Sequence, residues 1–108
     1  MTETTAPASM LLHLGQPGIT PEVPTKRVLF KTQSLQVVQL HLSAGKQIPP
    51  HSAPGEITVQ VLRGHVAFHV EDQTHELIPG TLLYVTAGAT HSLDAVKDSR
   101  VLVTKRLI

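Results

Sequence analysis

Two histidines with similar surroundings carry the clearest chemical signal in this sequence. His51 follows Gly45 after five residues, and His91 follows Gly80 through a short extended segment and a turn. A side chain that follows a turn can point into a cavity, so both rings are candidates for one shared site. Imidazoles ligate metal ions and also titrate near neutral pH, so the pair suits metal binding or acid–base chemistry.

A metal site generally needs at least three protein ligands, and two imidazoles alone would hold a divalent ion weakly. His41 is one candidate for the third ligand, because it lies on the more polar face of its predicted strand. Glu56 is the other, although strand alternation points it away from the cavity unless the preceding Gly55 resets the parity. Without a third ligand, His51 and His91 would form a metal-free, hydrogen-bonded pair.

Short strands and turn signals alternate from residue 27 onward. Their spacing of about 8–12 residues is typical of a β-sandwich or barrel, and no segment shows helical periodicity over ten or more residues. In residues 65–71, alternate apolar side chains mark the core side of a strand, so His65 and His69 are expected in solvent, together with His75. The chain is therefore predicted to be all-β.

The 108 residues predict a single folded domain with an N-terminal extension. Residues 1–9 are polar and lack any period, which indicates a disordered tail. Residues 10–26 contain glycines and prolines that rule out a helix, so they are expected to form an extended arm. Residues 27–108 are assigned to the β-barrel.

Composition excludes several classes of partner. The net charge is +1 and no block of basic residues occurs, so we expect no nucleic-acid partner. The absence of cysteine excludes disulfides and thiolate metal sites. No apolar stretch approaches the ~20 residues of a membrane helix, and no secretory signal is evident, so a cytoplasmic protein without a membrane partner is expected.

The spacing of glycine and histidine resembles the two sequence motifs of the cupin family. Gly45, His51 and Gly64 fit the first motif, in which a glycine, two histidines, a glutamate and a closing glycine follow one another. Residues 80–91 fit the second, which runs from a glycine through a turn to a histidine. The resemblance covers roughly residues 27–107 and points to a small single-domain cupin of the RmlC-like, type 2 kind.

Four positions depart from the family pattern: Thr86 replaces a proline and Ala95 an asparagine of the second motif, and the other two are metal-ligand positions of the first. Ala53 stands where the second histidine of the first motif belongs, and Ile57 stands where its glutamate belongs. Of the four metal ligands of a complete member, only His51 and His91 remain at matching positions. The resemblance therefore implies an incomplete metal-ligand set.

The resemblance implies a jelly-roll barrel, or double-stranded β-helix, with its functional site in the barrel mouth. His51 and His91 would form the centre of that site, with Gln60 and Tyr84 as pocket neighbours. A divalent transition metal (Zn, Fe, Mn or Ni) and a small organic molecule are the implied ligands, with no organic cofactor. Two function classes stay open: a metal-dependent enzyme, or a non-catalytic binding or sensor module with a decayed metal site. A purely structural partner protein is a third.

Residues 57–62 predict self-association. This strand is apolar and carries few charges on either face, and a small barrel has little core with which to cover two apolar faces. A partner subunit is the usual solution, and two-fold dimers are the commonest assembly. We therefore expect a homodimer; the family resemblance implies pairing through an outer sheet with the arm crossing over.

Overall fold

The computed structural model describes residues 8–14 and 25–108. Most of the predicted tail, and residues 15–24 of the predicted arm, lie outside this described part. Within it the chain forms β-strands and no helix, so no helix there is long and apolar enough to cross a membrane. The strands are β1 (Lys26–Lys31), β2 (Leu35–Leu42), β3 (Gln47–His51), β4 (Ile57–Arg63), β5 (Val66–Val70), β6 (Gln73–Leu77), β7 (Leu82–Val85), β8 (His91–Ala95) and β9 (Ser99–Arg106).

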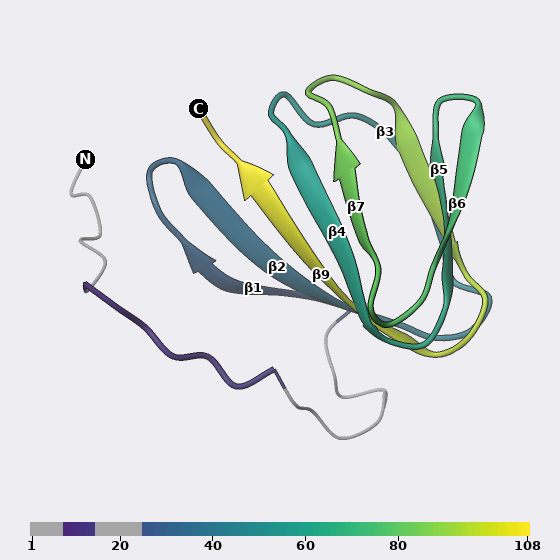
Figure 1. The fold of residues 1–108 in the computed structure, drawn as a ribbon, viewed down its shortest axis with the longest axis horizontal. Helices are drawn as coiled ribbons and strands as arrows, with labels where there is room; N and C mark the ends of the chain where they lie inside the picture. Colours follow the sequence, from purple (N-terminus) through teal and green to yellow (C-terminus); the bar gives the residue numbers. More distant parts are fainter. Residues whose placement is uncertain (1–7, 15–24) are drawn as a thin grey trace.

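The strands form two antiparallel sheets that face each other (Figure 1). The larger sheet has the order β1-β2-β9-β4-β7, and the smaller has the order β3-β8-β5-β6. In the figure the two sheets meet at the lower edge and separate toward the top. This arrangement confirms the all-β jelly-roll prediction.

Alternating strands supply the core from both sheets. Val59 and Val61 of β4 face Val66 and Phe68 of β5, and all four are buried. The residues that alternate with them along the same strands point outward, because successive side chains of a strand lie on opposite faces. The core side predicted for residues 65–71 is therefore confirmed.

Strand β2 is buried on both of its faces. Val38 points inward to the core, while Gln39 and His41 point to the outer face and are buried there as well. Leu14 contacts this outer face, because its carbonyl accepts hydrogen bonds from Gln39 Nε2 at 3.2 Å and from an Arg100 guanidinium nitrogen at 3.0 Å. The arm is thus attached to β2 and β9 at Leu14.

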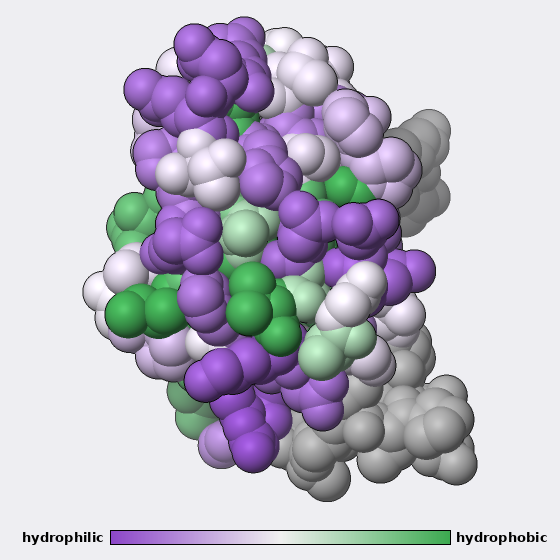
Figure 2. All heavy atoms as spheres, turned by 90° about the vertical axis from the view of Figure 1, so that its right-hand side faces the viewer, coloured by the Kyte–Doolittle hydropathy of each residue, from purple (hydrophilic) through white to green (hydrophobic). Residues whose placement is uncertain are grey.

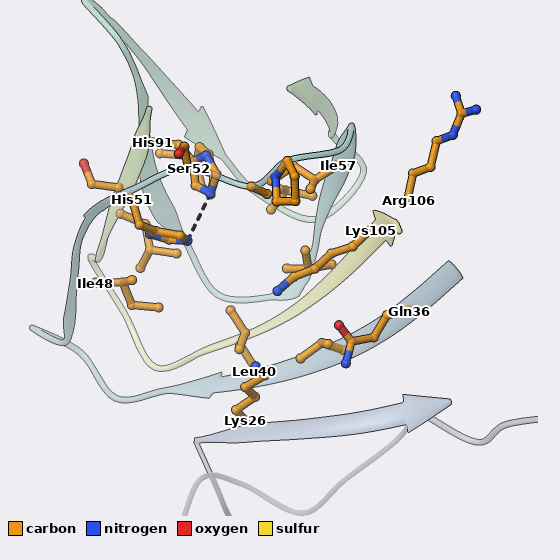
Figure 3. Close-up of a pocket in the computed structure, with 18 of the residues that line it drawn as sticks. Lys26, Gln36, Leu40, Ile48, His51, Ser52, Ile57, His91, Lys105 and Arg106 are labelled. Carbon is orange, nitrogen blue, oxygen red and sulfur yellow. Dashed lines mark hydrogen bonds between the residues drawn. The ribbon is translucent and has the colours of Figure 1, made fainter. Parts of the chain in front are cut away.

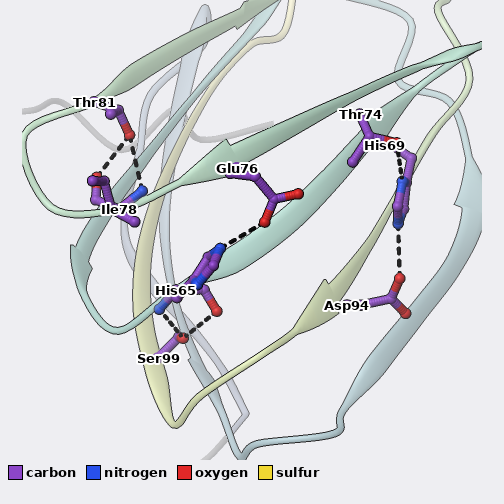
Figure 4. Close-up of polar contacts among 8 residues, drawn as sticks. All are labelled: His65, His69, Thr74, Glu76, Ile78, Thr81, Asp94 and Ser99. Atoms are coloured by element: carbon purple, nitrogen blue, oxygen red, sulfur yellow. Dashed lines mark hydrogen bonds and ion pairs between the residues drawn. The ribbon is translucent and has the colours of Figure 1, made fainter.

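The outer face of the smaller sheet is polar. His69 bridges Thr74 Oγ1 and Asp94 Oδ2, at 2.9 and 2.7 Å, and His65 Nε2 contacts Glu76 Oε1 at 2.6 Å (Figure 4). Hydrophilic residues cover most of this side of the molecule in Figure 2. His65 and His69 thus take part in cross-strand polar contacts on the predicted solvent side of β5.

Candidate functional site

A cavity of about 470 Å³ opens between the two sheets (Figure 3). Both sheets contribute to its lining, which is mainly apolar. Its apolar wall includes Leu40, Ile48, Val59, Phe68, Leu93 and Val103. Polar side chains enter the cavity at a few points only, which is the usual composition of a small-molecule site.

His51 and His91 meet at one wall of this cavity. His51 ends β3 and His91 begins β8, and the two residues are direct partners in the antiparallel ladder. Their Nε2 atoms lie 3.1 Å apart, and their rings meet edge to face with centroids 4.3 Å apart (Figure 3). The structure therefore brings together the two imidazoles that the motif spacing singled out.

Backbone carbonyls fix the proton positions of both rings. His51 Nδ1 lies 3.1 Å from the Pro49 carbonyl oxygen, and His91 Nδ1 lies 3.0 Å from that of Ala89. A carbonyl oxygen only accepts, so each Nδ1 must carry its hydrogen. A neutral imidazole then has a bare lone pair at Nε2, and two lone pairs at 3.1 Å repel. The pair is satisfied when one ring is an imidazolium whose Nε2–H donates to the other ring.

The two rings differ in their environments. His91 is 6% exposed and stacks on Phe68, with centroids 5.7 Å apart. Burial lowers the pKa of His91, the hydrogen bond to the Ala89 carbonyl raises it, and the charges of His51 and Lys105 lower it further, with a net shift downward. His51 is exposed at the cavity wall. A ligand in the cavity therefore meets His51 as the accessible ring and His91 as the fixed ring behind it.

His41 does not reach this pair. It lies on the face of β2 opposite Val38 and Leu40, which line the cavity, and it is buried on that outer face instead. Its proposed role as a third metal ligand is therefore corrected. The polar character of its face reflects contacts with the arm and with Arg100, and the cavity is lined by the apolar face.

Glu56 also points away from the cavity. Its carboxylate accepts hydrogen bonds from the Tyr84 hydroxyl and from an Arg106 guanidinium nitrogen, the latter at 3.3 Å. These hydrogen bonds, from Tyr84 first and then Arg106, lower the pKa of Glu56, and Glu56 in turn raises the pKa of Tyr84. Glu56 is thus engaged on the outside of the barrel, as strand alternation predicted, and the Gly55 turn does not redirect it inward.

Gln60 and Tyr84 are likewise on the outer side. Gln60 lies between the buried Val59 and Val61 on β4, so alternation turns it outward. Tyr84 pairs with Thr58 in the ladder and is 53% exposed. Their sequence-based placement as pocket neighbours is corrected, because neither lines the cavity that holds the two histidines.

Lys105 is a polar side chain of the cavity that motif reasoning missed. It follows Val101 and Val103 at a spacing of two residues on β9, and both valines are buried. The same alternation directs Lys105 into the cavity, where Figure 3 shows its amine extending toward the space in front of His51. Burial, and secondarily the charge of Lys26, lower the pKa of Lys105. The spacing of two residues between Val101, Val103 and Lys105 on β9 is the sequence signal that predicts Lys105 on the cavity side.

The donor set does not fit a resident metal ion. Across residues 8–14 and 25–108, no group of three His, Cys, Asp or Glu side chains lies close enough to hold one. The two candidates for a third ligand are engaged elsewhere. The site instead offers one hydrogen-bonded imidazole pair, an apolar wall and a partly buried amine.

Solved structures of several bacterial proteins resemble this fold. A conserved protein of unknown function from Streptococcus pyogenes matches with a TM-score of 0.72 and 28% sequence identity, over 77% of this chain and 73% of that one. An RmlC-like cupin from Desulfovibrio desulfuricans matches with a TM-score of 0.70 and 24% identity, over 87% and 97%. The DMSP lyase DddQ from Ruegeria pomeroyi matches with a TM-score of 0.65 and 26% identity, over 70% of this chain and 40% of the lyase.

The sequence indicates the family independently of the fold. No curated protein matches the chain. Residues 38–104, however, match the cupin domain family. That span contains both histidines, the cavity wall between them and most of each sheet. The chain therefore belongs to the cupin domain family.

Proposed function

We propose that this protein binds a small organic molecule in the cavity between its sheets, with His51 and His91 as the polar end of the site. One observation carries the proposal: two Nε2 atoms converge to 3.1 Å on the wall of an otherwise apolar cavity of about 470 Å³. Small-molecule sites commonly have volumes of about 300–1,000 Å³ and place a few polar groups in an apolar lining. This cavity has both properties.

The imidazole pair would recognise a ligand by hydrogen bonding. With both Nδ1 atoms donating to carbonyls, the Nε2 atoms are the groups left to face a ligand. His51 is the accessible ring and His91 is held against Phe68, so a ligand atom would displace the contact between the rings. A ligand acceptor would accept a hydrogen bond from a protonated Nε2, and a ligand donor would donate to the lone pair of a neutral one.

A divalent metal bound by the same two rings is the second candidate. One observation favours it: a backbone carbonyl orients each ring through Nδ1 and leaves Nε2 free, as outer partners do for metal-ligating histidines. Zinc, iron, manganese or nickel held there would supply Lewis-acid chemistry. The incomplete donor set ranks this candidate below ligand binding without metal.

Elemental analysis and imidazole NMR on tag-free protein test both candidates. We expect no stoichiometric metal, and we expect the ring resonances of His51 and His91 to move when a library of small organic fragments is added. His51→Asn should abolish these shifts, and the matched control His13→Asn, at an exposed histidine, should retain them. Near-stoichiometric transition metal would favour the second candidate. A library that moves neither ring would contradict ligand binding.

A further inference from the structure

The charged groups of the cavity are of one sign. Its lining contains Lys26, Lys105 and Arg106 in addition to the two histidines, and it contains no aspartate or glutamate. Arg106 is already compensated, because its guanidinium group pairs with Glu56 at 3.3 Å and extends away from the cavity in Figure 3. The uncompensated positive charge therefore belongs to the two lysines.

Lys105 is held where an ammonium group lacks a partner. It lies on the core-facing side of β9, opposite Ile57 in the ladder with β4. In the described part of the chain no carboxylate pairs with Lys105 or Lys26. Burial and the neighbouring Lys26 disfavour the ammonium form and lower the pKa of Lys105. A buried charge without a counter-charge costs free energy, so a ligand that supplied a negative group would be favoured.

We propose that the ligand is a small organic anion with an apolar body, held by its negative group at Lys105 and by a second polar group at the His51–His91 pair. This rests on the proposed function of the cavity. Lys26 adds charge at the same end as Lys105, and the apolar body lies along Phe68 and the neighbouring wall. Lysine contacts carboxylates and phosphates alike as a point charge, so both kinds of anion meet this description.

Titration of labelled protein with matched anionic and neutral probes tests the proposal. The probes are benzoate, hexanoate and phenyl phosphate, with benzamide and hexanamide as neutral counterparts. Binding of each probe is monitored by the NMR shifts of the backbone amides and the imidazoles. We expect an anion to bind about tenfold or more tightly than its amide, because a hydrogen bond to a charged group is stronger than one between neutral groups. Comparing benzoate and hexanoate with phenyl phosphate identifies whether the site prefers a carboxylate or a phosphate. The preference should shrink as salt is raised.

Lys105→Met isolates the charge while keeping the length of the side chain. We expect it to bind benzoate and benzamide equally, whereas the control Lys46→Met, at an exposed lysine, keeps the preference. Lys26→Met provides a second variant, in which we expect the preference for the anionic probe to be partly lost. If the wild-type protein binds neutral and anionic probes equally at His51, the inference is overturned and the proposed binding function stands. If neither class of probe moves the His51 and His91 resonances, both fail.

Discussion

His51 and His91 show how a histidine pair can be set by the backbone alone. The carbonyls of Pro49 and Ala89 belong to the segments that lead into each histidine, two residues before it. Each ring is therefore oriented at Nδ1 by its own approach segment, and His91 also stacks on Phe68. The result is a pair of Nε2 atoms directed at each other across two adjacent strands.

His41 is a buried residue whose charge state should affect stability. It is 3% exposed, and neither ring nitrogen has a hydrogen-bond partner in the described part of the chain. Burial first, and then Arg100 on β9 and Arg27 on β1, lower its pKa from the ordinary value of 6.5. The unfolded chain therefore binds the proton at a higher pH than the folded chain. Stability is fully present above pH 6.5 and falls as the pH drops through and below that value.

His41→Leu should flatten this pH dependence. Urea unfolding of the wild-type protein between pH 7.5 and 5 is expected to show a falling free energy of unfolding, and the variant a smaller fall. Some dependence remains, because burial also lowers the pKa of His91. His13→Leu, at an exposed histidine, serves as the control and should follow the wild type. An unchanged slope in His41→Leu would contradict the assignment of this pH dependence to His41.

At the scale of the elements, Gly64 closes the turn between β4 and β5 against the start of β9. Its φ is +98°, and a Cβ there would lie 2.3 Å from Ser99 Oγ and 2.4 Å from the Asp98 carbonyl oxygen. The Ser99 hydroxyl in turn accepts a hydrogen bond from the His65 amide at 3.0 Å. The closing glycine of the first motif is thus required by close backbone approach as well as by its conformation.

Comparing alanine at two glycines should separate these two requirements. Gly80 has a similar φ of +95°, and a methyl group at that position would have nothing within 4 Å, so Gly80→Ala should cost only the conformational strain of about 1–2 kcal/mol. Gly64→Ala adds a clash with Ser99 and should cost a further ~1–3 kcal/mol. Denaturant midpoints measure both variants. Equal losses of stability in the two variants would mean that the turn at Gly64 opens to accommodate the methyl group without a cost in free energy.

Strand alternation predicted the elements well where one face of a strand meets solvent. In β5 the alternation predicts Val66 and Phe68 on the core side, and the structure buries them there. In β2 the same reasoning could not choose the cavity face, because both faces of that strand are buried. Glu56 follows the alternation, whereas Gln60 and Tyr84, expected as pocket neighbours, lie on the outer side.

At the scale of the whole molecule, the cavity depends on contacts that no local pattern encodes. The motif spacing specified His51 and His91 because both lie at the ends of short segments with fixed lengths. Lys105 and Lys26 reach the same cavity through the pairing of β1, β2 and β9, which lie far apart in the sequence. Sequence patterns therefore identified the imidazole end of the site, and the tertiary fold revealed its cationic end.

The remaining prediction concerns a second copy of the chain. β7 is an edge strand of the larger sheet, and its outward residues Leu82 and Tyr84 are 67% and 53% exposed. The smaller sheet, by contrast, presents a largely hydrophilic face (Figure 2). An exposed apolar edge favours pairing with another chain, and closed two-fold dimers are the commonest result. We therefore expect a homodimer that buries β7 and the outer face of the larger sheet.

Light scattering should then give twice the chain mass of 11.7 kDa. Leu82→Lys places a charge on the edge strand and should shift the protein toward the monomer, since charged side chains block edge pairing. Val96→Lys is the matched control, because Val96 is 50% exposed but lies in the turn after β8 and not on the edge strand. A wild-type monomer at tens of micromolar would refute the dimer. A dimer that survives Leu82→Lys but not Val96→Lys would move the interface from β7 to the turn after β8.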